Sequence, residues 1–104
     1  MRFGPWHRLH EAAAAAPQAA GVLQVRLEAG LVVYPRGKSA MILYAAADDL
    51  RAACSRLAAE HPHAAWLCRF DRDGAGEPRA AAAALLADFV DRFGEAPALP
   101  RAPR

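Results

Sequence analysis

Basic side chains are the residues of this chain with the clearest capacity for chemistry. Guanidinium and ammonium groups bind phosphate through charge and through directed N–H donors. A predicted hairpin turn and the predicted start of a helix could bring several of them together. They are Arg26, Arg36, Lys38, Arg51 and Arg56. These residues form a candidate nucleic-acid surface, and scattered solubilising charge is the alternative interpretation.

The segment Gly37-Lys38-Ser39 matches the end of a phosphate-binding loop, in which a glycine-rich backbone and a helix N-terminus cradle the phosphate. The full motif requires a glycine five residues before Gly37, and that position is Val32. It also requires a helix after the serine, where this chain has the pattern of a strand. We therefore predict a solvated turn here and no nucleotide site.

The histidines occur as two pairs that could each supply two metal ligands. His7 and His10 share a helical spacing of three, and His61 and His63 flank a proline. No carboxylate or cysteine stands at a spacing that completes either set. We therefore predict no resident metal.

Nucleophilic catalysis has weak support in the sequence. Ser39 and Ser55 lie outside any G-x-S-x-G elbow. Cys54 lies on a predicted helix and Cys68 on a predicted strand, each in an apolar setting. Buried free thiols, and not a disulfide, are the expected state of both cysteines.

The elements that must position these side chains follow from hydrophobic periodicity and from turn residues. Pro5 and Trp6 are expected to open the first helix, with Trp6 as its buried anchor, and Asp48 is expected to cap the second. The predicted order is helix 5–16, strands 21–27, 31–34 and 40–46, helix 49–60, strand 65–70 and helix 77–93.

This order predicts an α+β (mixed α/β) fold with a small, mainly antiparallel sheet of three to four strands flanked by helices. The strand 40–46 is apolar on both faces, which is typical of a central strand. The length of 104 residues indicates one domain. We assign residues 1–19 to an N-terminal helix of that domain, 20–97 to its α/β body and 98–104 to a disordered proline-rich tail.

Composition restricts the function classes. The chain is 55% hydrophobic and 23% charged, as expected for a globular protein, and its net charge of +2 is too small to indicate nucleic acid by itself. The N-terminus lacks the apolar run of a signal peptide, and no run is long enough to span a membrane. A cytoplasmic protein with no membrane partner is expected.

Three short motifs resemble the GIY-YIG domain over roughly residues 20–97. Gly21-Val22-Leu23 is similar to the first motif of that family, and Tyr44-Ala45-Ala46 followed by Asp48-Asp49-Leu50 is similar to the second. The closing run Phe93-Gly94-Glu95-Ala96-Pro97 resembles the aromatic-Gly-x-x-Pro end of its last helix. The resemblance implies a small α/β module with a mostly antiparallel sheet between helices.

The resemblance also implies where catalytic groups would stand. Active members use a tyrosine, a helix arginine and a glutamate that holds one divalent metal. The corresponding positions here are Leu23, Ala53 and Ala82. We therefore expect a catalytically degenerate member without a cofactor. A rearranged site using Mg²⁺ or Mn²⁺ would depend on Tyr44, Arg51 or Arg56, and Glu77.

Three functions remain open at this point. The first is a non-catalytic binding or accessory module with a nucleic-acid or protein partner. The second is a divalent-metal-dependent DNA endonuclease with the rearranged site. The third is a protein-interaction module that forms a homodimer through its apolar sheet or its alanine-rich helices.

Overall fold

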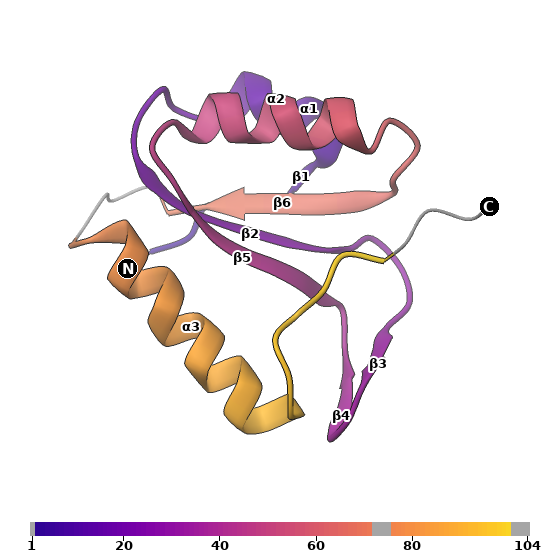
Figure 1. Cartoon of the computed structure of the whole chain (residues 1–104). Coiled ribbons are helices and arrows are strands. Elements are labelled where there is room, and N and C mark those ends of the chain that lie inside the picture. Colours follow the sequence, from indigo (N-terminus) through magenta and orange to yellow (C-terminus); the bar gives the residue numbers. More distant parts are fainter. Residues whose placement is uncertain (1, 72–75, 101–104) are drawn as a thin grey trace.

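A four-stranded antiparallel sheet in the order β1-β6-β2-β5 organises the computed structural model, and a separate hairpin pairs β3 with β4 (Figure 1). The structure describes residues 2–71 and 76–100. The elements are β1 (His7–Arg8), α1 (Leu9–Ala15), β2 (Gly21–Leu27), β3 (Val32–Tyr34), β4 (Gly37–Ser39), β5 (Met41–Ala47), α2 (Leu50–Glu60), β6 (Trp66–Phe70) and α3 (Pro78–Phe93). The predicted fold class is confirmed.

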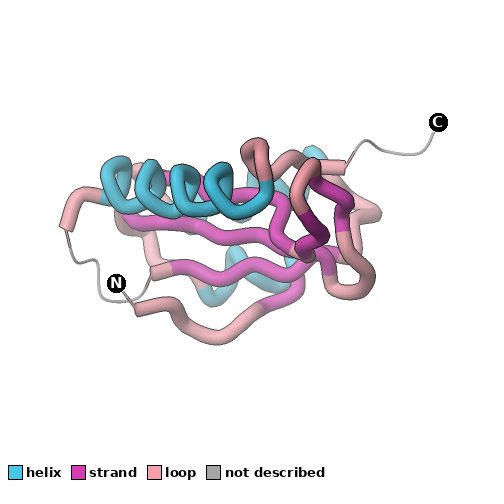
Figure 2. The backbone as a smooth tube through the Cα atoms, turned by 90° about the horizontal axis from the view of Figure 1, so that it is seen from below, coloured by secondary structure: helices cyan, strands magenta, loops and turns pink. Residues whose placement is uncertain are grey.

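The helices form a layer on each face of the sheet. Helices α1 and α2 lie together on one face, and α3 lies on the other face against β5 and β2 (Figures 1 and 2). The alternation of β2 explains this, because Leu23 and Val25 point into the α1/α2 layer while Gln24 and Arg26 point to the α3 side. A Cβ on Gly21 would lie 2.7 Å from Leu50 Cδ1, so any side chain there would force the buried Leu50 side chain to shift.

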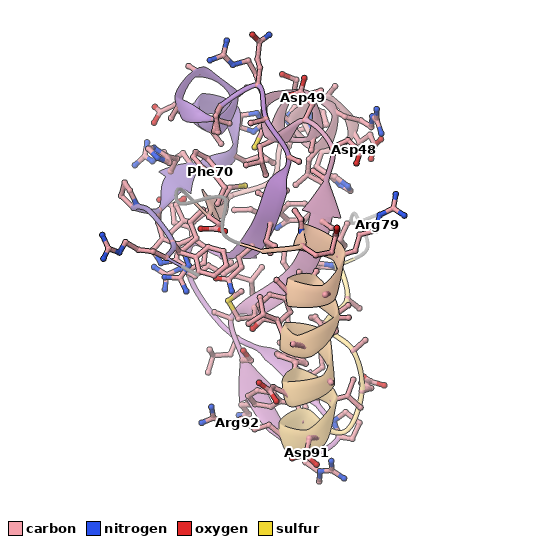
Figure 3. All side chains as sticks on the ribbon, turned by 90° about the vertical axis from the view of Figure 1, so that its left-hand side faces the viewer. Asp48, Asp49, Phe70, Arg79, Asp91 and Arg92 are labelled. Atoms are coloured by element: carbon pink, nitrogen blue, oxygen red, sulfur yellow. The ribbon has the colours of Figure 1, made fainter. Side chains whose placement is uncertain are left out.

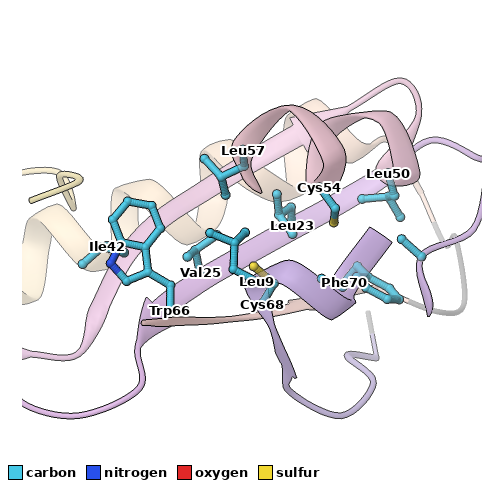
Figure 4. Close-up of a cluster of buried hydrophobic side chains, with 12 residues drawn as sticks. Leu9, Leu23, Val25, Ile42, Leu50, Cys54, Leu57, Trp66, Cys68 and Phe70 are labelled. Atoms are coloured by element: carbon cyan, nitrogen blue, oxygen red, sulfur yellow. The ribbon is translucent and has the colours of Figure 1, made fainter. Parts of the chain in front are cut away.

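The main core fills the space between the sheet and the α1/α2 layer (Figure 4). Leu9, Leu50 and Cys54 from the helices meet Val25 and Cys68 from the strands, and each is at most 1% exposed. The complete cluster is Leu9, Ala12, Ala16, Leu23, Val25, Ile42, Leu50, Cys54, Leu57, Trp66, Cys68 and Phe70. Helix α1 therefore contributes to the same core as α2 and the sheet.

The first helix begins at Leu9 and not at Pro5. His7 and Arg8 form β1, which pairs with Cys68 and Leu67 at the edge of the sheet. Gly4 N also donates to Phe70 O at 3.1 Å. Backbone pairing with β6 therefore overrides the helical spacing at the N-terminus, and Trp6 lies outside the helix instead of anchoring it.

The apolar strand β5 lies at an edge of the sheet, which corrects the expectation of a central position. Leu43 and Ala47 pack against the main core on one side, whereas Tyr44 meets Phe89 of α3 on the other. The apolar character of both faces thus reflects the two helical layers. The central strands are β6 and β2.

The ends of the long helices follow local rules. Asp49, one residue after the predicted cap, accepts a hydrogen bond from Ala52 N at 3.0 Å at the start of α2. Glu77 and Pro78 open α3, and Gly94 closes it with a φ of 93°, as predicted.

Residues 35–39, expected as a turn or wide loop, include β4 and the tight end of the β3–β4 hairpin. The tail also differs from expectation at its first residues. Ala98 N donates to the Tyr34 hydroxyl at 3.4 Å, and Leu99 packs against the main core. The prediction of disorder for 101–104 lies outside the described residues.

Candidate functional site

The predicted basic residues do not form one surface. Arg36 and Lys38 belong to the β3–β4 hairpin, and Arg51 and Arg56 belong to α2. Arg26 projects from β2 on the opposite face of the sheet from α2. The sheet itself therefore separates the candidates into groups with different roles.

Arg36 caps the C-terminus of α3. Its guanidinium Nη2 donates to Asp91 O at 2.6 Å and to Val90 O at 3.1 Å, and its backbone N donates to Phe93 O at 3.0 Å. A cation at this end also complements the helix dipole. Arg36 thus has a structural role that holds the hairpin to the helix.

Arg51 is likewise used within the fold. Its Nε donates to Ala16 O at 3.0 Å, which ties the start of α2 to the end of α1. Arg56 is exposed further along α2. Tyr44 lies across the sheet from both, in edge-to-face contact with Phe89 at 5.9 Å between ring centroids. Tyr44 therefore shares no site with either arginine.

Glu77 stands at the start of α3, where its carboxylate accepts from Arg79 N at 3.3 Å. With Asp48 and Arg79 it lines a surface pocket of about 320 Å³. Figure 3 labels Asp48, which follows β5, and Arg79, in the first turn of α3. No group of three or more histidine, cysteine, aspartate or glutamate side chains in residues 2–71 and 76–100 is placed to hold a metal. The residues of the rearranged nuclease site are thus dispersed.

A different set of side chains does come together on the α3 side of the sheet. Gln24 and Arg26 project from β2, and Arg69 projects from β6, where it stands opposite Gln24. The register of β1, with His7 opposite Cys68, places the preceding residue Trp6 beside Arg69. We call Phe3, Trp6, Gln24, Arg26 and Arg69 the arginine–aromatic cluster.

Stacking holds the two guanidiniums of the cluster. The Cζ atoms of Arg26 and Arg69 each lie 4.4 Å from the Trp6 ring centroid, and Arg69 Cζ lies 4.9 Å from that of Phe3. Arg69 Nε donates to Gln24 Oε1 at 2.6 Å. These cation–π contacts fix the position of the two positive charges without neutralising them, because an aromatic ring has no net charge.

The positive charge of the cluster has no negative counterpart in the described chain. Neither Arg26 nor Arg69 forms an ion pair with a described carboxylate, and Arg26 Nε is buried without a hydrogen-bond partner. Asp71 lies two residues beyond Arg69, is buried, and accepts from Arg2 N at 3.3 Å. Burial, together with the nearby Arg26 charge, lowers the pKa of Arg69. The cluster therefore has the electrostatics of an anion site.

Tyr44 extends the cluster toward α3. It stands opposite Gln24 on β5, so Trp6, Arg69, Gln24 and Tyr44 form one row across the sheet. Burial raises the pKa of Tyr44, and the positive charge of Arg69 acts in the opposite direction. At neutral pH its hydroxyl is protonated and can donate a hydrogen bond.

Sequence reasoning identified Arg26 and Tyr44 but missed Phe3, Trp6 and Arg69 as site residues. The signal for Arg69 was present, because the apolar alternation of Trp66, Cys68 and Phe70 leaves residue 69 on the other face. The two aromatic residues had no such signal. Their helical spacing concealed a segment that pairs with the sheet edge.

The thiols are free and buried, as expected. Burial raises the pKa of Cys68 to about 12 and also raises the pKa of Cys54. Both cysteines are thus protonated core residues with no nucleophilic role.

Comparison with known proteins adds no assignment, since no family model, curated protein or solved structure matches the chain. None of the helices in the described ranges has the length and apolar character needed to cross a bilayer.

Proposed function

We propose that this chain is a non-catalytic, GIY-YIG-like module that binds nucleic acid through phosphate contacts at Arg26 and Arg69. The observation that carries the proposal is the pair of neighbouring guanidiniums that have no carboxylate partner among residues 2–71 and 76–100. Like charges held together in a partly buried setting destabilise a fold unless an anion joins them. A phosphodiester supplies that anion and accepts hydrogen bonds from both side chains.

The dispersal of the other candidates supports a binding role over catalysis. The α2 arginines lie behind the sheet from Tyr44, and Glu77 serves the first turn of α3. Phosphodiester hydrolysis needs a nucleophile, a charge stabiliser and usually a metal within reach of one phosphate. We therefore rank the metal-dependent endonuclease below the binding module.

Fluorescence anisotropy with labelled nucleic acid tests the proposal. Replacing both arginines (Arg26→Gln and Arg69→Gln) is expected to weaken binding at least tenfold at low salt, because each charge-assisted phosphate contact is lost. Arg56→Gln is the control, since it removes one exposed positive charge from the opposite face, and each single variant (Arg26→Gln or Arg69→Gln) is compared with it. Equal losses in the double variant and the control would refute a specific site.

Incubation of the protein and the same nucleic acid with Mg²⁺ or Mn²⁺ distinguishes the endonuclease from the binding module. The binding module leaves the strands intact. Metal-dependent cutting that disappears in Glu77→Gln would establish the alternative instead.

A protein-interaction module is the second candidate, and two surface features favour it. Leu31 and Val33 at the β3–β4 hairpin are 59% and 71% exposed, and β5 is an apolar edge strand. Exposed edge strands can pair with a second chain. Light scattering tests this candidate, because a dimer mass without nucleic-acid binding would favour it over the binding module.

A further inference from the structure

The arginine–aromatic cluster has a geometry that bears on the form of its ligand, an inference that rests on the proposed function. The row Arg69, Gln24 and Tyr44 crosses β6, β2 and β5, and Trp6 continues it just before β1, so an aromatic ring stands at each end. Strands about 4.8 Å apart give this row a length of roughly 14 Å. Arg69 lies between the rings, and Arg26 stands on the same face opposite Leu67. The Tyr44 ring contacts Phe89 of α3, so the surface combines one aromatic platform, at Trp6, with two phosphate-binding groups.

The two guanidiniums gather their donors around one ring. The Cζ atoms of Arg26 and Arg69 both lie 4.4 Å from the Trp6 ring centroid. Arg69 Nε donates to Gln24 and Arg26 Nε is buried, so the donors left for a ligand are the Nη groups of the two side chains. A phosphate beside Trp6 can accept hydrogen bonds from both residues at once.

From this arrangement we infer that the ligand is a single-stranded nucleic acid, with a phosphate on Arg26 and Arg69 and a neighbouring base stacked on the aromatic end at Trp6. Base–aromatic stacking is tolerant of sequence because every base has a π face. We therefore expect little discrimination among base sequences.

A duplex fits the same surface poorly. Its bases are stacked on one another and offer no free face to Trp6. Its two phosphate strands also require cations spread along a longer path. Here Arg36 and Arg51 are bonded to backbone carbonyls, and Arg56 lies on the other layer. The net charge of +2 adds little long-range attraction.

The test compares a labelled oligothymidylate of about eight nucleotides with the corresponding blunt duplex. We expect the single strand to bind the whole chain at least tenfold more tightly than the duplex. Contact with one phosphate predicts a log–log salt slope of about −0.7 for the single strand.

Variants of the aromatic end make the test specific. Trp6→Leu is expected to weaken single-strand binding by about tenfold, and Trp6→Phe by less, because the phenyl ring still stacks. Arg56→Gln again serves as the control. The emission of the buried Trp66 verifies that each variant is folded.

A second measurement does not depend on removing Trp6. In a Trp66→Phe variant, the emission of Trp6 should be quenched when the single strand binds, because a base stacks on its ring. Unchanged emission at saturation would overturn the inference.

The outcomes distinguish this inference from the proposed function. Duplex binding as tight as single-strand binding, still dependent on Arg26 and Arg69, would overturn the inference and keep the proposed function. Full single-strand affinity in folded Trp6→Leu would also overturn the inference alone. Failure of the wild-type chain to retain either probe at low salt would overturn both.

Discussion

The two faces of the sheet are built from different chemistry. On the α1/α2 face, hydrocarbon side chains and two protonated thiols fill a closed core. On the opposite face, α3 covers β5 with aromatic rings, and the N-terminal segment leaves two guanidiniums partly exposed beside Trp6. The first face is a closed apolar core. The second carries two neighbouring positive charges that have no carboxylate partner in the described part of the chain, and this difference is the basis of the proposed binding site.

Single arginines show the same contrast between groups that are bonded within the fold and groups that are not. Arg36 donates to two carbonyl oxygens at the end of α3, whereas Arg26 has a buried Nε without a partner. Stability and binding should therefore depend on different arginines. Substitutions on the two faces test this division of roles.

The largest effect is expected in the closed core. Leu50 is fully buried between α2 and β2, and Leu50→Ala should destabilise the protein by about 2–5 kcal/mol through lost burial and a residual cavity. Urea unfolding followed by circular dichroism measures the change. A loss below about 1 kcal/mol, well under the range for such core substitutions, would show that this face is not tightly packed.

The buried thiol gives the core a pH dependence. An unfolded cysteine titrates near 8.5, roughly the model-peptide value, whereas the pKa of native Cys68 is raised to about 12. Above the lower value the unfolded state releases the thiol proton first. Stability from Cys68 is thus fully present at lower pH and is lost as pH rises between these pKa values, at up to about 1.4 kcal/mol per pH unit.

Comparison with Cys68→Ala isolates this contribution, since Tyr34 and Tyr44 also have raised pKa values. Unfolding under reducing conditions at several alkaline pH values should show a steeper decline for the wild type than for the variant. Parallel curves would mean that the thiol is solvated and that the core opens.

Loss of the α3 cap should have a smaller effect. Arg36→Ala removes two hydrogen bonds and a favourable charge from the helix end, which should cost about 1–2 kcal/mol of unfolding free energy. Lys38→Ala, an exposed neighbour on β4, should change stability by less than about 0.5 kcal/mol. Equal effects of the two substitutions would argue against the cap.

The smallest stability effect is expected at the binding face. Arg26→Met keeps the length of the side chain and removes one of two neighbouring charges and a buried unbonded Nε. The cation–π contact that is lost contributes about 0.5–1 kcal/mol, so stability should stay within about 1 kcal/mol of wild type. Binding should fall in the same variant. A destabilisation larger than that of Arg36→Ala would reverse the proposed division of roles.

Local sequence signals predicted most of the architecture. Alternation along 21–27 identified β2, and the stripe Leu50, Cys54 and Leu57 identified the buried face of α2. Glycine and proline marked both ends of α3. These features succeed because a strand or helix pattern is repeated over several residues and needs no knowledge of distant partners.

Prediction failed where a distant partner decided the outcome. Trp6 has helical spacing with Leu9, yet pairing of 7–8 with β6 takes priority because β6 offers an open sheet edge. The strand β5 reads as central because helical layers cover both of its faces, and sequence alone does not report the missing neighbour. Prediction was least successful for the candidate site, because its residues come from three separate segments: the N-terminus, β2 and β6.

Taken by itself, the order of residues determined which segments form helices and strands, which faces are apolar, and that both cysteines are buried. Which charges meet depends instead on how the strands pair. Arg26 and Arg69 are far apart in the chain, and the antiparallel register of β2 on β6 brings them to one face beside Trp6. Periodicity is a local property of the backbone, whereas register depends on long-range strand pairing. The site is formed by the register, which periodicity does not predict.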